Sequence, residues 1–486
     1  MGIGKKILGS VVVASAVWAG VTAYISSSTE GYLQQYIEKT NSIYSKNGMK
    51  MSLKSFDKGY FSSTAKLSLD FSEPGVKEEI SKILKLPLTL DYSIENGPLF
   101  FKDGISFGAS KISSNINFSK LFVDENGLKE IIKEDLIVQS SVRVDFMNNA
   151  TYKGETNRLV ADVDNDIFTI SPLKLNGEMD LETFVGEFRL LSEKVTGELA
   201  NGGKVKLENI ILNGDITKFF ENGFYLGKFD FAADKLNIDN PNLPQKVKNA
   251  KVYMSMNIDQ DSSDTVNLDT DMRLDLGETE IPEAFNFGNK FTFNYGIDGM
   301  RLEAVLAFQD EMKKIEEEKT SILQKLTSAT TAEEQAVALE NLQNMQGTLE
   351  GKVKLLLSNF LVKDKTKLSV AASIVDNRDS KSHASLDMKY IGDAQLPKTL
   401  EELQAKFKKE ILNWITLNVD MILQKSLVEK LPRDVQSQLS MAMMTGVVKD
   451  NNSTLEFNAI YVPKKLTING EDKSSMIQLA EMSMQQ

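Results

Sequence analysis

Three aspartates at alternate positions have the spacing that most resembles a metal site. Asp162, Asp164 and Asp166 follow the pattern that begins an EF-hand calcium loop. That loop needs a glycine at its sixth position and a glutamate at its twelfth, where this chain has Ile167 and Leu173. Acids at alternate positions also arise on the solvent-facing side of a strand. We therefore interpret this segment as a solvated strand face and assign it no metal.

A second acidic segment departs from the calcium loop in the same way. It contains Asp259, Asp261 and Asp264, and Asp264 takes the glycine position while Thr270 takes the twelfth. We expect this segment to lie in a turn. Two carboxyl groups that flank a glycosidic bond could also catalyse its hydrolysis. No spacing selects two of the 68 acids, so a carboxylate-based hydrolase of envelope glycan stays an alternative without assigned catalytic residues.

The chain is poor in the other residues that common catalysis uses. It has no cysteine and a single histidine, His383. Thiolate metal sites, thiol nucleophiles and multi-histidine zinc sites are therefore excluded, and we find no nucleophile elbow, phosphate-binding loop or Gly-x-Gly-x-x-Gly motif. We expect His383 to be an exposed strand or loop residue. No catalytic, cofactor-binding or metal-binding residue is predicted, and a non-enzymatic role is favoured.

Methionines gather in two patches near the C-terminus. The first contains Met441, Met443 and Met444, and the second contains Met476, Met482 and Met484. Thioethers bind Cu(I) and also form adaptable apolar surfaces. We interpret these patches as core filling and a frayed C-terminal tail.

The overall composition is that of a globular protein, with 41% hydrophobic and 26% charged residues. The net charge is −12, and no segment presents a basic stripe. Nucleic acid and anionic headgroups are therefore not expected partners.

The N-terminus has the pattern of a membrane anchor. Lys5 and Lys6 precede an uncharged run over residues 7–29, and Glu30 follows it. At about 1.5 Å of helical rise per residue, this run reaches roughly 34 Å and would cross a hydrocarbon core of about 30 Å. The lysines predict a cytoplasmic N-terminus, with residues 1–30 as cytoplasmic tip and anchor and the bulk of the chain in the periplasm.

Residues 31–48 are predicted to continue the anchor as a helical stalk, which Asn47-Gly48 ends. Residues of one helical face recur at a spacing of three and four; they are Leu33, Tyr36, Ile37, Thr40, Ile43 and Tyr44. Such a stripe must pack on the protein's own body or on a second copy, and the bolder form of this prediction is a homodimer.

Residues 49–300 have the period of two that is typical of β-strands. The clearest strand alternates an apolar face of Val266, Leu268, Met272, Leu274 and Leu276 with a polar face of Asn267, Asp269, Asp271, Arg273 and Asp275. Similar runs occur at 112–118, 252–258 and 291–295. Turn motifs separate the runs: Asn96-Gly97-Pro98, Asp103-Gly104, Asn126-Gly127, Asn176-Gly177, Asn201-Gly202-Gly203, Asn213-Gly214 and Asn222-Gly223. We predict an antiparallel meander that forms an extended or curved sheet.

Residues 301–350 are predicted to form a helical hairpin, whose second helix begins at a Thr331/Glu334 capping box and stops at Gly347. Residues 351–486 are predicted to mix strands and helices. The expected strands are Lys352–Phe360, Thr366–Val375 and a closing pair over Leu455–Asn469, and the expected helices start at Pro397 or span Asp420–Leu431 and Val435–Met444. The predicted class is α+β and β-rich, with an αα-hairpin insertion, C-terminal helices and an N-terminal transmembrane helix.

Three short segments carry a family resemblance. Residues 56–63, Phe-Asp-Lys-Gly-Tyr-Phe-Ser-Ser, resemble the aromatic-x-x-Gly-x-Phe-Ser-Ser segment of the YdgA family of Gram-negative inner-membrane proteins. Asn96-Gly97-Pro98 is similar to that family's His-Gly-Pro, with the histidine replaced, and residues 466–470 end a similar closing pair. The family has no known function, so the resemblance brings no catalytic residue. Gly59 and Gly97 suit turns, and Phe61 suits a core anchor.

Together these observations predict a single-pass protein of the cell inner membrane that acts in the envelope. The leading hypothesis is an apolar ligand such as lipid, or an envelope partner's strand, bound along the dry face or groove of the sheet. The alternatives are the glycan hydrolase and a purely structural scaffold.

The competing interpretation of the N-terminus is a cleaved signal peptide, because Ala14-Ser15-Ala16 has the small-x-small form of a cleavage site. Cleavage there would leave Trp18 and Tyr24 on the mature chain, whereas an uncleaved anchor uses the whole uncharged run. We expect N-terminal sequencing of the membrane-extracted protein to find the N-terminus intact. A sequence that begins near Val17 or Thr22 would contradict the anchor.

Overall fold

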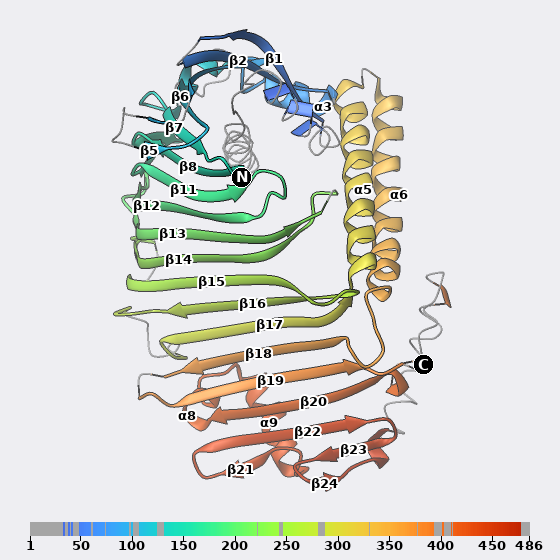
Figure 1. Cartoon of the computed structure of the whole chain (residues 1–486). Coiled ribbons are helices and arrows are strands. Elements are labelled where there is room, and N and C mark those ends of the chain that lie inside the picture. Colours follow the sequence, from blue (N-terminus) through green and yellow to red (C-terminus); the bar gives the residue numbers. More distant parts are fainter. Residues whose placement is uncertain are drawn as a thin grey trace. The chain divides into compact units, whose positions relative to one another are not determined.

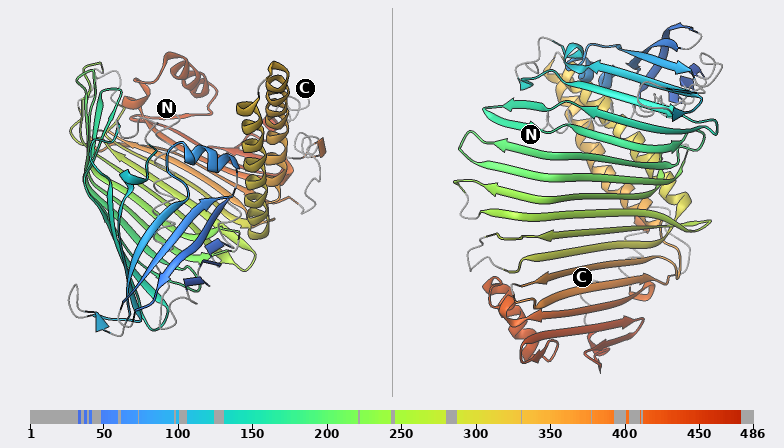
Figure 2. Two further views of the ribbon diagram at one scale, coloured as in Figure 1. Left: turned by 90° about the horizontal axis from the view of Figure 1, so that it is seen from above. Right: turned by 60° about the vertical axis from the view of Figure 1, so that its left-hand side comes forward.

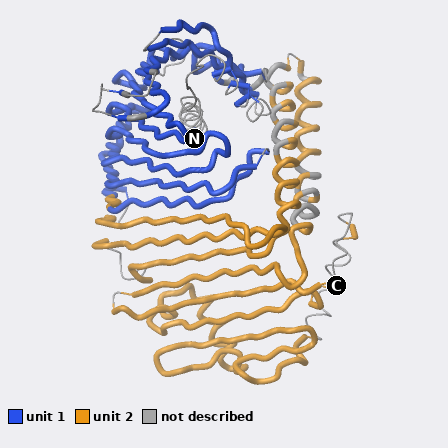
Figure 3. Tube along the Cα trace, viewed as in Figure 1, with its two compact units in different colours: residues 1–234, 238–242 blue, residues 235–237, 243–486 orange. Residues whose placement is uncertain are grey.

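The computed structural model describes most of the chain between residues 33 and 477 and shows two compact units (Figure 3). Unit 1 comprises residues 1–234 and 238–242, and unit 2 comprises residues 235–237 and 243–486. The described ranges are 33–34, 37–38, 40–41, 48–59, 62–72, 74–96, 99–100, 106–123, 131–220, 222–242, 246–279, 287–329, 331–376, 378–392, 401–402, 410 and 412–477. The boundary between the units falls inside strand β14 (Tyr225–Asp239).

The predicted anchor over residues 7–29 lies outside the described residues, as does Phe61. None of the described helices combines the length and the apolar character that a membrane crossing requires.

Unit 1 is built from antiparallel strands, as the period of two predicts (Figure 1). Successive neighbours are β1–β2–β3–β6–β7–β8–β11–β12–β13, and the β9–β10 hairpin pairs with the last residues of β12. The strands are β1 (Met49–Asp57), β2 (Ser62–Phe71), β3 (Leu88–Asn96), β6 (Ser110–Asn117), β7 (Ile137–Val144), β8 (Asn149–Thr156), β9 (Leu159–Val163), β10 (Asp166–Ile170), β11 (Leu173–Asp180), β12 (Gly186–Glu198) and β13 (Lys204–Phe219). Helix α3 (Pro74–Ser81) follows β2, the 3-10 helix η2 (Phe118–Leu121) follows β6, and β4 (Leu99–Phe100) pairs with β5 (Ser106–Phe107).

The described part of the predicted stalk packs on the body of unit 1. Residues 33–34, 37–38 and 40–41 are helical. Leu33 and Ile37 are 3% and 7% exposed and lie in the core formed by β1, β2, β3 and β6. The side chain of Asn41 bonds to both backbone groups of Met51 in β1, at 2.8 and 2.9 Å. Intramolecular packing is thus confirmed for Leu33 and Ile37; a homodimer through the stalk stays a prediction.

Two of the predicted turns, Asn176-Gly177 and Asn213-Gly214, are wrong, because both glycines lie inside strands. Gly177 stands opposite Tyr152 and Phe188, and Phe188 stands opposite Gly214. A Cβ on Gly214 would lie 2.2 Å from the Phe188 ring, so the aromatic ring occupies the space that the glycine leaves.

The Tyr152 side chain is buried in this part of the sheet. Its hydroxyl donates a hydrogen bond to the Glu187 carbonyl at 3.1 Å, and burial raises the pKa of the hydroxyl.

The other described turn motifs behave as predicted. Asn201-Gly202-Gly203 joins β12 to β13, and Asn222-Gly223 joins β13 to β14. Gly202 and Gly223 have φ of 83° and 89°, which an L residue rarely adopts. The glycines of the remaining turn motifs lie outside the described residues.

Unit 2 contains a second run of antiparallel strands, paired in the order β15–β16–β17–β18–β19–β20–β22–β23. They are β15 (Val247–Ser262), β16 (Thr265–Asp275), β17 (Lys290–Arg301), β18 (Lys367–Val375), β19 (Lys381–Tyr390), β20 (Ile415–Gln424), β22 (Thr454–Val462) and β23 (Lys465–Ile468). The short strands β21 (Lys449–Asn451) and β24 (Glu471–Asp472) pair with β22 and β23. The predicted strands at 252–258, 291–295 and Thr366–Val375 and the closing pair are confirmed.

The αα-hairpin between β17 and β18 is also confirmed, but it is longer than predicted. Its helices are α5 (Leu302–Ser328) and α6 (Ala332–Ser358). Thr331 and Glu334 exchange the two hydrogen bonds of a capping box, each 3.2 Å long. The predicted stop at Gly347 and the strand over Lys352–Phe360 are wrong, because α6 continues through this region. A glycine costs a helix interior about 1 kcal/mol, which a long helix tolerates.

In the C-terminal region one predicted helix is a strand. Residues 415–424 form β20, and only α8 (Lys425–Val428) is helical within Asp420–Leu431. Alternation of Leu417, Val419 and Met421 with polar neighbours fits a position between β19 and β22. Helix α9 (Arg433–Met444) confirms the prediction for Val435–Met444, and the predicted start at Pro397 lies outside the described residues.

The contact between Gly214 and Phe188 gives a test of the sheet. Gly214→Ala should destabilise unit 1 by about 1–3 kcal/mol, because the added methyl meets the Phe188 ring. In a Phe188→Ala background the same change should cost little. Urea unfolding of the four proteins in this cycle measures the coupling, and additive free-energy changes would contradict the proposed contact.

Candidate functional site

The three alternating aspartates of unit 1 lie at a hairpin. Asp164 and Asn165, with φ of 55° and 70°, form the turn between β9 and β10. The Asp162 carboxylate accepts from the Asn165 backbone and lies 3.3 Å from Lys133, and Asp166 accepts from the Ala200 backbone at 2.7 Å. These carboxylates serve the turn and do not converge.

The prediction that the second acidic segment lies in a turn is confirmed only for Asp264, because Asp259 and Asp261 belong to the end of β15. Asp259 accepts hydrogen bonds from Asn257 and Asn267, each at 3.0 Å. Hydrogen bonds from Ser262 and Lys365 hold the pKa of Asp264 below its usual range. Within the described ranges, no group of three or more histidine, aspartate or glutamate side chains is arranged to hold a metal ion.

His383 is a strand residue, as expected, but it is half-buried rather than fully exposed. Its Nε2 lies 3.0 Å from an Asp420 carboxylate oxygen on the neighbouring strand β20. Asn458 of β22 donates to the other oxygen of Asp420 at 3.4 Å. These three side chains link three strands, and the pattern of the sequence alone did not pair them.

The interpretation of the methionine patches as core filling is wrong for Met441 and Met444 on α9, whereas Met443 is half-buried. Met441 and Met444 are 59% and 86% exposed, and Met476 is 42% exposed. Met482 and Met484 lie outside the described residues.

The strands of unit 2 lie side by side in a sheet (Figures 1 and 2), and one face of this sheet is uncharged. We call this the apolar face; it contains side chains from alternate positions of successive strands, which the register aligns in four rows that run across the strands. The central row is Met254, Met272, Phe293, Ala372, Ala384, Met421 and Phe457. On one side lie the row Met256, Thr270, Tyr295, Val370, Leu386, Val419, Ala459 and Ile468 and the row Ile258, Leu268, Ile297, Leu368, Met388, Leu417, Tyr461 and Leu466. On the other side lie Val252, Leu274, Phe291, Ile374 and Ser382, followed by Leu423 and Leu455.

Burial differs along the apolar face. At β22 and β23, Leu455, Ala459 and Ile468 are 2%, 8% and 5% exposed. At β15 and β16, Met254 and Met272 are each 42% exposed. The apolar face is therefore covered at the β22–β23 end and open to solvent toward β15.

The opposite face of the same strands is polar and carries the charged groups. A hydrogen bond from Ser369 and the charge of Lys367 lower the pKa of Asp387. Burial and the nearby charges of Asp298 and Asp259 raise the pKa of Asp269. The two faces therefore differ in solvation as well as in composition.

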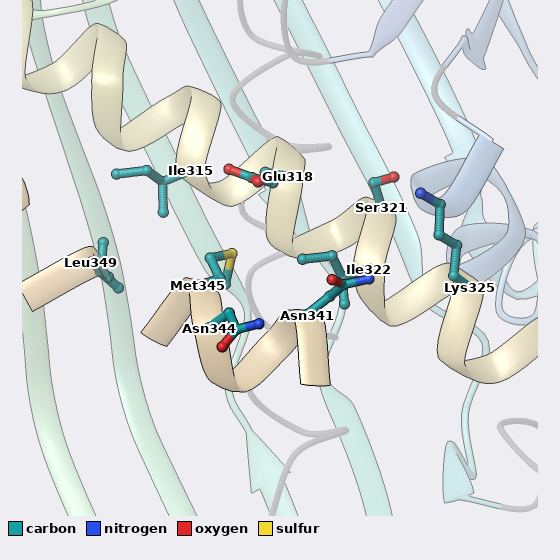
Figure 4. Close-up of a pocket in the computed structure, with 9 residues that line it drawn as sticks. All are labelled: Ile315, Glu318, Ser321, Ile322, Lys325, Asn341, Asn344, Met345 and Leu349. Atoms are coloured by element: carbon teal, nitrogen blue, oxygen red, sulfur yellow. The ribbon is translucent and has the colours of Figure 1, made fainter. Parts of the chain in front are cut away.

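A pocket between α5 and α6 is lined by both apolar and polar side chains (Figure 4). Its volume is about 480 Å³. Ile315, Ile322 and Met345 form its buried part, and Glu318 and Lys325 are among the exposed polar side chains that complete it. We interpret it as space between the two packed helices, because its apolar residues are those that hold the hairpin together.

Unit 1 brings three acids together on its polar side. Glu178 stands opposite Glu187, and Glu187 stands opposite Asp215. They belong to the lining of a shallow cavity of about 580 Å³ that also includes Lys153 and Arg189. All five residues are exposed, and their surroundings do not distinguish a proton donor from a nucleophile, as hydrolysis of a glycosidic bond requires.

These features define a β-rich α+β protein with large antiparallel sheets and a continuous apolar face. Comparison with protein families shows that the chain belongs to the family described as "Bacterial protein of unknown function (DUF945)", which matches residues 5–475. This match is compatible with the YdgA-like resemblance and spans nearly the whole chain. No curated protein and no solved structure matches the chain.

The raised pKa of Asp269 predicts a stabilising substitution on the polar face. The folded protein binds a proton at Asp269 more readily than the unfolded chain does, so ionisation of this group destabilises the fold at neutral pH. Asp269→Asn should raise the melting temperature at pH 7, and the gain should fade as the pH drops below about 4, where the unfolded chain also protonates the group.

Asp387→Asn is the matched control, because the pKa of Asp387 is lowered and its ionisation stabilises the fold. Its substitution should lower the melting temperature at pH 7, and the loss should diminish at acid pH. The same sign of shift for both variants at pH 7 would contradict this account.

Proposed function

We propose that the protein is held in the inner membrane by residues 7–29 and binds an apolar ligand such as lipid along the apolar face of unit 2, in the periplasm. The observation that supports this most is the absence of any charged side chain from the apolar face over eight successive strands.

The exposure of this face is energetically costly without a ligand. Soluble proteins rarely expose contiguous apolar patches larger than a few hundred Å², and larger patches mark interaction sites. Each methylene group that a ligand buries contributes about 0.8 kcal/mol. An apolar ligand therefore recovers free energy from Met254, Met272 and Phe293, each of which is 42% exposed.

The backbone of this sheet argues against an added partner strand on its face. Strands β16–β20 each pair with a neighbour on both sides, so their backbone donors and acceptors are already used. A folded protein partner would normally form about one hydrogen bond per 100–200 Å² of interface. The apolar face offers few polar groups, among them Thr270, Tyr295 and Ser382. A lipid chain needs no hydrogen-bond partner on this face.

Adjacent residues on opposite faces provide the test. Phe293→Asp places a charge on the apolar face, whereas Asn294→Asp places one on the polar face of the same strand. We expect mass spectrometry of the detergent-extracted full chain to find bound lipid with the native protein and with Asn294→Asp, and much less with Phe293→Asp.

Lipids held around an anchor would be common to all three proteins, so the difference between the variants is the measurement. Equal lipid content in both variants, with the same melting curve, would contradict binding at this face. Copurified glycan fragments or a stoichiometric protein would instead favour the alternatives.

A further inference from the structure

Exposure within the apolar face is concentrated in its central row. Met254, Met272 and Phe293 are each 42% exposed, and Ala372 and Ala384 are also exposed. On β15–β18 the neighbours of this row on the apolar face, such as Met256 and Phe291, are half-buried. The solvent-accessible part of the face is therefore a strip that crosses the strands.

The middle of this strip has its smallest side chains, the alanine pair Ala372 and Ala384, which we call the furrow. Ala372 of β18 and Ala384 of β19 stand opposite each other. They are flanked within the row by Phe293 on one side and Met421 on the other. Because two methyl groups stand where larger side chains precede and follow, the surface is lowest at the alanine pair.

The strip has the length of a lipid chain. The exposed part of the central row, from Met254 to Ala384, makes four steps between strands. At about 4.8 Å per step this is roughly 19 Å. The chains of one leaflet span roughly 15 Å, half of a hydrocarbon core of about 30 Å, so the row can hold a whole acyl chain.

The two ends of the strip differ. Toward β22 the row becomes covered, since Phe457 is half-buried and its neighbours along the strand, Leu455 and Ala459, are 2% and 8% exposed. Met254 at the β15 end is open. A charged headgroup finds no partner on the apolar face and must stay in solvent, which assigns the methyl end of a bound chain to the β22 side.

From these observations we propose that one acyl chain of a membrane phospholipid lies across the strands in the central row, over the Ala372–Ala384 furrow, with its methyl end toward Phe457. This inference rests on the proposed function and adds the ligand class, the position and the direction of the chain.

Filling the furrow tests the position. Ala372→Phe should weaken binding of a dipalmitoyl phospholipid, presented in mixed micelles to the full chain, by roughly tenfold or more, since it displaces about two methylene groups. Ala371→Phe is the matched control, because Ala371 lies one residue away on the polar face. It should leave the affinity unchanged.

A diazirine on the acyl chain tests the direction. With the probe near the methyl end, we expect crosslinks at β20 and β22, around Met421 and Phe457. With the probe near the ester, we expect crosslinks at β15 and β16, around Met254 and Met272. The reverse order would overturn the assigned direction, and crosslinks along a single strand would overturn the crosswise arrangement.

The outcomes separate this inference from the proposed function. If Phe293→Asp removes bound lipid while Ala372→Phe binds as well as Ala371→Phe, the apolar face binds lipid but the furrow does not hold the chain. If free palmitate competes but the phospholipid does not label the row, the ligand is a fatty acid and the phospholipid assignment is overturned. If neither probe labels the face, both proposals fail.

Discussion

The register of antiparallel strands keeps two chemically different faces apart in unit 2. Side chains alternate along a strand, so a shift of one residue moves every side chain to the other face. A shift of β16 would carry Asp269, Asp271 and Arg273 onto the apolar face. The shift would also move Leu268 and Leu274 to the polar face, and the loss of apolar burial together with partial desolvation of the charged groups is a penalty that disfavours it. The uncharged face exists because this penalty applies to each strand in turn.

Side-chain hydrogen bonds on the polar face reinforce the same register. Ser369 of β18 donates to Asp387 of β19 at 2.7 Å, and His383 of β19 bonds to Asp420 of β20 at 3.0 Å. Each of these hydrogen bonds joins neighbouring strands. Each would be broken if one strand shifted by a residue, because one partner would then move to the other face. In unit 1 the aromatic rings over Gly177 and Gly214 have a comparable effect, because each ring packs against a residue directly across the ladder.

Local sequence patterns predicted the strands and helices that are determined by residues close together in the chain. The alternation around Leu268 and Asp269 gave both faces of β16, and the Thr331/Glu334 spacing gave the start of α6. Asn213-Gly214 failed as a turn, because its role depends on Phe188 in another strand, which no local pattern reveals. The central row is equally non-local, since it appears only once seven strands are placed in register.

The chemistry of the apolar face limits what it can select. Its attraction for a ligand comes from the burial of apolar surface, which is non-directional and carries no preference for a particular headgroup. Length and shape can still be selected, because the row is finite and is covered at its β22 end, where Leu455 and Ala459 are buried. Met254 and Met272 stand opposite each other at the open end, where their flexible side chains can adapt to chains of different thickness. Selection of a headgroup therefore requires residues beyond this face.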